Sequence, residues 1–206
     1  MSTIVTVAFR EPYLTHNDNQ VAVLTGNYQL RVFRDVLPYK EGIVKENIVS
    51  RFQQSLYGFK PHAIELARQS GADKVIWFDP SLYPLSSIDD LFDELDKTDM
   101  LVKMGDHPIN EMTNDKAIKW FGLNRSDLTD VKHIGGTFYG FNFNNPKTAE
   151  VFELWKKAEE EGIFGTQDEF MAGHWADESC MTLAMFKCGV EQKNSKTLKY
   201  RNQKDS

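Results

Sequence analysis

Lys74-Val75-Ile76-Trp77-Phe78-Asp79 is a run of four apolar residues between a lysine and an aspartate. An unbroken apolar run of this length is typical of a strand buried on both faces, as in a parallel sheet covered by helices. Pro80 follows and ends the strand, because proline cannot donate to the ladder of a central strand. Ligands of such sheets bind outside the carboxyl ends of the strands, so we expect Asp79 at the mouth of a ligand crevice.

Strand and helix patterns alternate along the rest of the chain. Further strands are predicted over residues 4–9, 30–36, 100–104 and 137–143, the last entered through Gly135-Gly136. Helices are predicted over residues 45–57, 61–69, 115–121, 146–161 and 177–188, and another after an N-cap at Ser86 or Ser87. The polar stretch of residues 10–20 is predicted to be a loop. Long helices after strands predict an α/β fold with a mostly parallel central sheet flanked by helices.

Length and composition favour one soluble domain. The chain has 206 residues, of which 41% are hydrophobic and 26% charged, and this excludes a wholly disordered protein. We expect one domain over residues 1–190 and a basic C-terminal tail over residues 191–206. No apolar run approaches the roughly 18–20 residues of a membrane helix, and the first residues lack the basic start of a signal peptide. The sequence therefore predicts a cytoplasmic protein without a membrane span.

The net charge of −6 is unevenly distributed. Residues 187–206 hold six basic and two acidic side chains, a net charge of +4, so the other 186 residues carry −10. An acidic body argues against broad electrostatic binding of nucleic acid. The basic end could contact phosphates or an anionic surface, but a frayed, solvated terminus is the favoured expectation.

The two cysteines, Cys180 and Cys188, fall in one predicted helix. A spacing of eight residues separates them by about 12 Å along the helix axis, which is too far for a disulfide. Two free thiols suit a reducing compartment. Neither cysteine has metal-ligand spacing to another cysteine or to a histidine.

Two roles are open for Asp79 from the residue pattern alone. Its carboxylate could hold a divalent cation such as Mg²⁺ or Mn²⁺ against a pyrophosphate, because these ions prefer oxygen ligands. It could equally cap the turn through Pro80 and Ser81. The sequence lacks the signatures of P-loop NTPases, dinucleotide-binding dehydrogenases, α/β-hydrolases and zinc proteases.

Several segments resemble the donor-binding region of GT-A glycosyltransferases, a group within the nucleotide-diphospho-sugar transferase superfamily. The Lys60-Pro61 helix start and the strand ending in Asp79-Pro80-Ser81 are similar to that family's helix and acidic-motif strand. Gly135-Gly136-Thr137-Phe138-Tyr139-Gly140-Phe141-Asn142 resembles its glycine-rich aromatic strand. His174-Trp175-Ala176-Asp177-Glu178-Ser179 resembles its His-x-x-Asp-(Gln/Glu)-Ser helix start. The matches run from about residue 59 to residue 188, roughly two thirds of the chain.

The resemblance implies a single GT-A-like domain that moves a sugar from a nucleotide-diphospho-sugar donor to an acceptor, either a glycan or a modified nucleic-acid base. A nucleoside diphosphate leaves, so the site must stabilise negative charge on the pyrophosphate. The implied donor-binding residues are Arg10, Lys60, Asp79, Ser81, Gly135, Gly136 and Asn142. Asp79 is also the implied ligand of a divalent cation, Mn²⁺ or Mg²⁺. Asp177 and Glu178 are the implied catalytic residues, with Asp177 as general base or as partner of the donor sugar.

A purely structural role stays open for each of these residues. Lys60 could be a solvated surface lysine, and Arg10 could form a salt bridge within a loop. Asp177 and Glu178 could serve only the start of a helix, where the helix dipole favours acids. The Gly135-Gly136 pair could be only a turn.

The acidic motif departs from the family pattern. The usual motif is Asp-x-Asp, whereas this chain has Asp79-Pro80-Ser81, and serine brings no charge. Metal binding through one carboxylate, transfer without a metal and loss of catalysis are therefore all open. The alternatives to a transferase are a non-catalytic nucleotide-sugar-binding or scaffold protein and a nucleotidyltransferase. Two nearby histidines, His133 and His174, could contribute to the site or lie at the surface, and surface positions are the favoured expectation.

Overall fold

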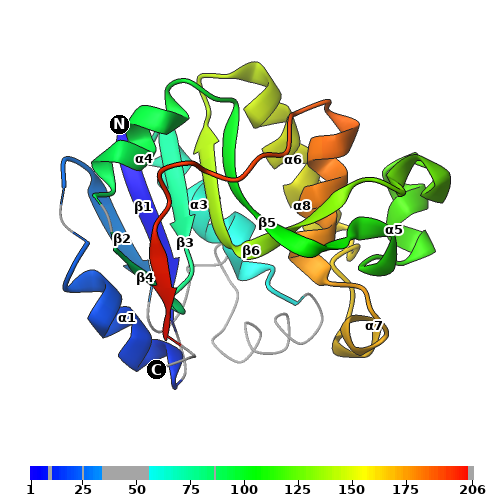
Figure 1. The fold of residues 1–206 in the computed structure, drawn as a ribbon, viewed down its shortest axis with the longest axis horizontal. Coiled ribbons are helices and arrows are strands. Elements are labelled where there is room, and N and C mark those ends of the chain that lie inside the picture. The colour runs from blue at the N-terminus through cyan, green and yellow to red at the C-terminus, as the bar shows by residue number, and fades with distance from the viewer. Residues whose placement is uncertain (9–10, 25, 34–55, 86, 204–206) are drawn as a thin grey trace.

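The computed structural model describes residues 1–206 except 9–10, 25, 34–55, 86 and 204–206. Its central sheet has five strands in the order β2-β1-β3-β6-β5. These are β1 (Ser2–Val7), β2 (Gln29–Phe33), β3 (Lys74–Phe78), β5 (Met100–Pro108) and β6 (Lys132–Asn142). β1 pairs in parallel with β2 and β3, while β6 runs antiparallel to β3 and β5. Only β6 of this sheet is reversed, which confirms the predicted α/β fold with a mostly parallel sheet (Figure 1).

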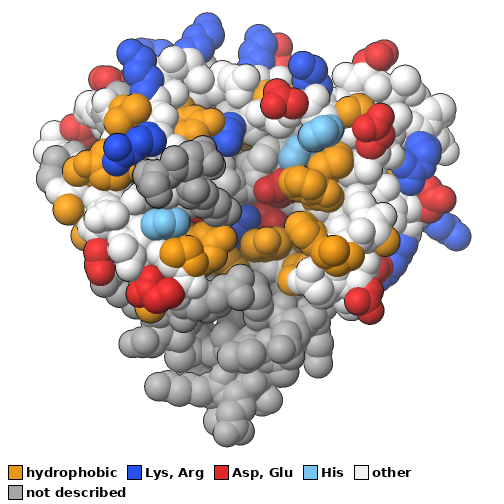
Figure 2. Space-filling view, turned by 60° about the horizontal axis from the view of Figure 1, so that its bottom comes forward, with side chains coloured by type: hydrophobic (Ala, Val, Ile, Leu, Met, Phe, Trp, Pro, Cys, Tyr) orange, Lys and Arg blue, Asp and Glu red, His pale blue; other side chains and the backbone are white. Residues whose placement is uncertain are grey.

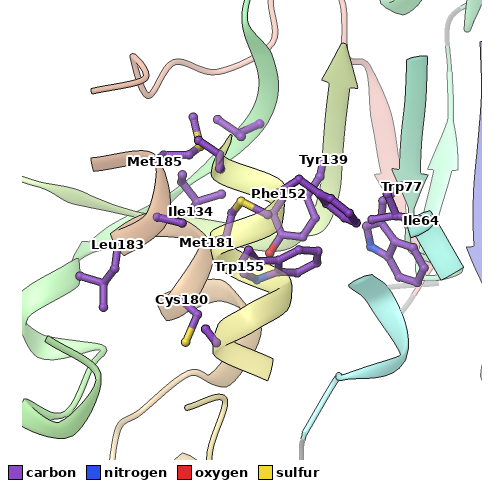
Figure 3. Packing of buried hydrophobic residues seen from close by; sticks show 14 of the residues in the cluster. Ile64, Trp77, Ile134, Tyr139, Phe152, Trp155, Cys180, Met181, Leu183 and Met185 are labelled. Atoms are coloured by element: carbon purple, nitrogen blue, oxygen red, sulfur yellow. The ribbon is translucent and has the colours of Figure 1, made fainter. Parts of the chain in front are cut away.

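Helices cover both faces of the sheet. Val75 and Trp77 of β3 join the larger core with α3 (Phe59–Gln69), α6 (Pro146–Glu160) and α8 (Ala176–Lys187). Ile76 and Phe78 point to the other face, into a smaller core that includes α4 (Asp89–Leu95). Figure 3 shows Trp155 close to Tyr139 in the larger core, with ring centroids 5.5 Å apart. β3 is therefore buried on both faces, as its unbroken apolar run predicts.

The helices predicted after strands are confirmed within about two residues. α3, α6, α8 and the short α5 (Asp115–Trp120) match the predicted segments. Asn145 caps α6 by accepting from the Lys147 N–H, and Pro146 occupies the first turn, where a missing N–H costs nothing. Single-turn 3₁₀ segments at Ile109–Glu111 and Arg125–Leu128 and the short α7 (Gln167–Met171) complete the helices that are described. Most of the helix predicted over residues 45–57 lies outside the described residues.

The prediction of a loop over residues 10–20 is wrong, because this segment contains α1 (Tyr13–Val21). α1 buries polar side chains, Asn17 and Gln20. The Asn17 amide donates to Thr6 Oγ1 of β1 at 3.1 Å, and the Gln20 amide donates to two backbone carbonyls of the turn after β3. Hydrogen bonds to the sheet thus replace the apolar face by which a helix is usually predicted.

Two element starts also differ from the prediction. α4 begins at Asp89, and Ser87 Oγ accepts from the Asp89 N–H at 3.2 Å, while Ile88 occupies the N-cap position. β6 begins at Lys132, so Gly135 and Gly136 lie inside the strand and do not form a turn before it. The register of β5 with β6 shifts between Val102 and Lys103, which is the irregularity that a glycine pair within a strand signals.

The C-terminal segment is held against the domain. A second sheet pairs β4 (Leu82–Pro84) with β7 (Tyr200–Asn202) in antiparallel fashion. Residues 194–203, here called the C-terminal strap, cross the domain to reach β4 (Figure 1). Glu94 of α4 anchors the strap by accepting from Lys196 N, Thr197 N and Ser195 Oγ. The favoured expectation of a frayed terminus is therefore wrong over these residues, because backbone pairing with β4 and the half-buried Glu94 hold them in place.

No helix in the described part of the chain is long and apolar enough to span a membrane. Cys180 and Cys188 are free, as their spacing predicts. Cys180 is buried, and burial raises the pKa of its thiol well above the ordinary value. Burial also raises the pKa of the Cys188 thiol, to about 11, so both thiols stay protonated near neutral pH.

Candidate active site

The site lies where the parallel strands end. β3 delivers Asp79, whose N–H donates to Thr137 O of β6 at 2.9 Å. One carboxylate oxygen, Asp79 Oδ1, accepts from the Ser81 N–H at 2.8 Å, so Asp79 shapes the turn as well as closing the strand. Figure 2 looks onto this edge of the molecule, which is hollowed near its centre with acidic and basic side chains inside and hydrophobic side chains around them.

A buried ion pair stands at the centre of the site. Lys60, from the first turn of α3, places Nζ 2.7 Å from Oδ2 of Asp177, from the first turn of α8. The two side chains are 3% and 1% exposed. Burial opposes the charge on Lys60, but Asp177, Glu178 and Asp79 outweigh it and raise the lysine's pKa. The alternative of a solvated lysine is therefore wrong, and Asp79 lies close enough to contribute to the same field.

The two carboxylate oxygens of Asp177 differ in their hydrogen bonding. Its Oδ2 accepts from Lys60 and from the hydroxyl of Tyr139 at 3.2 Å. Its other oxygen, Oδ1, is buried and has no hydrogen-bond partner among the described residues. Burial raises the pKa of Asp177 to about 7, with Lys60 pulling it down and Glu178 pushing it up. α8 has no side-chain cap at its start, so this carboxylate is not explained by capping.

Glu178, the next residue of α8, is bonded to β6 and to His133. Its Oε1 accepts from the Gly136 N–H at 2.7 Å, and its Oε2 lies 2.6 Å from Nε2 of His133. Burial opposes the charge of Glu178, but His133, Lys60 and the Gly136 N–H outweigh it and lower the pKa of the carboxyl. Glu178 therefore stays ionised while its neighbour Asp177 titrates close to neutrality.

Gly136 is the residue around which these groups meet. Its carbonyl accepts from Lys60 Nζ at 3.0 Å and from Trp77 Nε1 at 3.1 Å. A Cβ at this position would lie 2.7 Å from Lys60 Nζ and 2.8 Å from Glu178 Oε1. A side chain at this position would force Lys60 or Glu178 to move. Gly136 lies inside β6, so the alternative of a plain turn is wrong here. Gly135 differs, because a Cβ there would lie at an ordinary 3.6 Å from Lys103 O.

Other predicted residues are not brought to this cluster. Asn142 pairs in register with Lys74, at the opposite end of β3 from Asp79, and its amide donates to Leu95 O at 3.3 Å. Asn142 therefore lies away from the predicted donor crevice, and its amide links the opposite end of β6 to the last residue of α4. Ser81 is buried with 1% of its surface exposed. Arg10 lies outside the described residues.

Both nearby histidines are buried, which corrects the expectation of surface positions. His174 is 1% exposed, and its ring nitrogens contact Thr113 Oγ1 and Ile163 O at 3.3 and 2.8 Å. Burial lowers the pKa of His174, so it serves as a neutral structural residue. His133 is 4% exposed and contacts Glu178 inside the site. In the sequence, the one indication that His133 belongs to the site is its position just before Gly135-Gly136.

A divalent cation would have few protein ligands here. Among the residues that the structure describes, no group of three or more histidine, cysteine or acidic side chains is arranged to hold a metal ion. Mg²⁺ sites at phosphates commonly use only one or two carboxylates, with water and phosphate oxygens completing the shell. Asp79 fits that limited role, since Asp177 is paired with Lys60.

Comparisons with known proteins give likenesses only at the level of structure. No protein-family model matches the sequence, and no curated protein matches it. The galactosyltransferase LgtC, solved with donor and acceptor sugar analogues, is 10% identical over 90% of this chain and 70% of its own, with a TM-score of 0.48.

Two further solved structures are similar to the chain. A glycosyltransferase involved in glycosylation of the major capsid of PBCV-1 is 12% identical over 81% of this chain and 69% of its own, with a TM-score of 0.46. The glycosyltransferase GlyE of Streptococcus pneumoniae TIGR4 is 10% identical over 88% of this chain and 42% of its own, with a TM-score of 0.48. All three are glycosyltransferases, the class that the sequence motifs resemble. At such low identity, the roles of residues must be argued from this chain's own geometry.

Proposed function

We propose that this protein transfers a sugar from a nucleotide-diphospho-sugar donor to an acceptor hydroxyl. The observation that carries the proposal is the buried carboxylate of Asp177, paired through Oδ2 with Lys60 while Oδ1 stays without a partner. A buried polar atom without a partner is costly, so the unpartnered Oδ1 of Asp177, close to the ends of the strands, favours a ligand that donates to it. A sugar hydroxyl is such a donor.

Asp79 is proposed to face the pyrophosphate of the donor, directly or through a divalent cation. It follows the central strand at the edge where ligands of α/β sheets bind. A cation bound there would neutralise the charge that develops on the departing diphosphate. The positive charge of Lys60 lies close to the same carboxylate and contributes to that stabilisation while it holds Asp177 in place.

Asp177 is proposed to hydrogen-bond the donor sugar or to remove the proton of the acceptor hydroxyl. A general base works best when its pKa is near the working pH, and burial raises the pKa of Asp177 to about 7. Glu178 stays ionised and is fixed by Gly136 N and His133. Its negative charge therefore helps to raise the pKa of Asp177, and its side chain is proposed to line the site.

The test is a panel of UDP-, GDP- and ADP-sugars, with and without Mn²⁺, followed by thermal unfolding and by release of nucleoside diphosphate. A bound donor stabilises the native state, so the matching donor should raise the unfolding temperature and be turned over. Asp79→Asn and Asp177→Asn should each abolish turnover, whereas Asp168→Asn, at an exposed first-turn acid of α7, should leave it unchanged.

Three results would overturn or redirect the proposal. No stabilisation by any donor would remove the donor site. Stabilisation without turnover would favour a nucleotide-sugar-binding scaffold. Preference for free nucleoside triphosphates with release of pyrophosphate would favour a nucleotidyltransferase.

The acceptor is proposed to be a glycan. A modified nucleic-acid base is the alternative, and transfer from the matching donor to each kind of acceptor separates the two. The cytoplasm is the proposed location, because both cysteines are free and a reducing compartment keeps thiols in that state.

A further inference from the structure

The turn after β3 is bonded at four successive carbonyl groups. The Gln20 amide donates to Asp79 O at 2.8 Å and to Leu82 O at 2.9 Å. The Gln203 amide donates to Pro80 O at 2.9 Å, and the Gln203 N–H donates to Ser81 O at 2.7 Å. Two glutamines, one from α1 and one from the C-terminal strap, therefore satisfy every carbonyl from residue 79 to residue 82.

Gln203 also joins the turn to α1. Its amide nitrogen donates to His16 O at 2.9 Å, and its Oε1 accepts from Asn19 Nδ2 at 3.2 Å. Gln203 directly follows β7, whose Asn202 is in register with Leu82 of β4. The side chain is 5% exposed. It thus lies at the junction of α1, the strap and the turn.

The position of the Asp79 carboxylate depends on this turn. Asp79 Oδ1 accepts from the Ser81 N–H, and Asp79 O accepts from the Leu82 N–H at 3.0 Å. Removing the Gln203 amide would leave Pro80 O without this donor. Buried carbonyls that lose a partner drive local rearrangement toward water. A turn that rearranges would carry the carboxylate with it.

We propose that Gln203 is a positioning residue, which acts through the Asp79–Leu82 turn to hold the Asp79 carboxylate in the orientation that the donor pyrophosphate requires. The inference rests on the proposed function for its link to the donor. It assigns the C-terminal strap a part in the site, although the strap lies far from Asp79 in sequence.

The first arm of the test uses the protein without ligand. Amide hydrogen exchange at Ser81 and Leu82 should be faster in Gln203→Met and in the nearly isosteric Gln203→Glu, whose ionised carboxylate cannot donate to Pro80 O. The matched control is Gln192→Met, because the half-buried Gln192 also donates from its amide to a backbone carbonyl, Thr182 O at 3.0 Å, away from the turn. Exchange at Ser81 and Leu82 that is unchanged in both Gln203 variants would overturn the inference.

The second arm measures affinity for the donor found by the panel. A misplaced carboxylate loses its contacts with the donor, and each loss of about 1.4 kcal/mol is tenfold in affinity, so we expect donor affinity to fall about tenfold or more in both Gln203 variants. The Gln192→Met variant should bind within about twofold of the wild type. A loss of unfolding temperature in the Gln203 variants with donor affinity equal to the control would show a purely structural role and would overturn the inference.

The two arms keep this inference separate from the proposed function. If the wild type binds no nucleotide sugar, the proposed function fails and the positioning of a donor fails with it. If the wild type binds a donor while the Gln203 variants bind equally well, only the inference on Gln203 fails.

Discussion

Nζ of Lys60 lies 2.7 Å from Oδ2 of Asp177 in the interior of the protein, although 117 residues separate them in the chain. The pair joins the first turns of α3 and α8 across β6, and both side chains are buried. Removal of either partner alone would leave the other as an unpaired buried charge, which is strongly destabilising.

Lys60→Met should therefore destabilise the protein at pH 8 by about 3–5 kcal/mol, the usual cost of breaking a buried pair. Adding Asp177→Asn should recover part of that loss, since no unpaired acid then remains. Denaturant unfolding of both single variants and the double variant measures the coupling. The exposed pair of Lys157 and Glu161, 3.6 Å apart, supplies the control, and Lys157→Met should cost at most about 1 kcal/mol. Equal costs for the two lysines would contradict the central role of the buried pair.

The stability of the wild type should depend on pH through Asp177. Burial raises the pKa of this carboxyl to about 7, against about 3.9 in an unfolded chain. Between these values the folded state holds a proton that the unfolded state has released, so the stability contributed by Asp177 is complete below pH 4 and is lost as pH rises through about 7. Asp177→Asn cannot titrate, so the stability of the wild type relative to this variant should fall from pH 4 to pH 7. Unfolding temperatures of both proteins across this range would show parallel curves if the pKa were ordinary.

Gly136→Ala should damage the site far more than Gly135→Ala. The added Cβ at residue 136 would lie 2.7 Å from Lys60 Nζ, whereas a Cβ at residue 135 would lie 3.6 Å from Lys103 O. We expect donor turnover to fall more than about tenfold for Gly136→Ala, because the lysine and Glu178 must move. Turnover of Gly135→Ala should stay within about twofold, since alanine fits a strand without strain. Steady-state rates with the matched donor decide between the two, and equal losses would contradict the crowding argument.

Glu94→Gln should loosen the C-terminal strap. Burial opposes the charge of Glu94, but bonds from Lys196 N and from Thr197 and Ser195 outweigh it and lower the pKa of the carboxyl. Losing one such bond costs about 1 kcal/mol, or about 2–4 °C in unfolding temperature for a chain of this size.

The pH dependence of the Glu94 effect has a defined sign. Because the folded pKa lies below the unfolded one, the stability from Glu94 is present above its ordinary pKa and is lost as pH falls through the folded pKa. The difference between wild type and Glu94→Gln should therefore narrow in acid. A difference that is constant down to pH 3 would show that the charge of Glu94 plays no part.

The strands were the most predictable part of the fold. Lys74–Phe78 has an unbroken apolar run, and β1 has a β-branched one, so hydrophobic pattern alone places both in a buried sheet. Asp79 could be placed at the sheet edge by the same argument. The approach of Asp177 to Lys60 could not be predicted from pattern, because it depends on how two helices pack across β6.

Two parts of the structure that could not be predicted from the sequence, α1 and Gln203, are held by buried polar side chains. α1 has little apolar character, and its buried face consists of Asn17 and Gln20. Helix prediction relies on apolar periodicity, so it does not detect a helix that packs through hydrogen bonds of buried side-chain amides. Gln203 in the strap is missed for the same reason, since an isolated glutamine near a basic segment carries no pattern that distinguishes it from solvated residues.

The hydrogen bond between Gln203 and Pro80 joins residues that are 123 positions apart in the chain. This sequence separation affects the order in which the parts of the protein fold. Contacts between distant segments form late in folding, because a long loop must close before they gain anything. The parallel strands and α3 can pack around β3 without the strap, so the orientation of Asp79 becomes fixed only when the strap closes on the turn. During translation the same bond can form only after β7 has been synthesised, so the turn that holds Asp79 is completed by the last described strand of the chain.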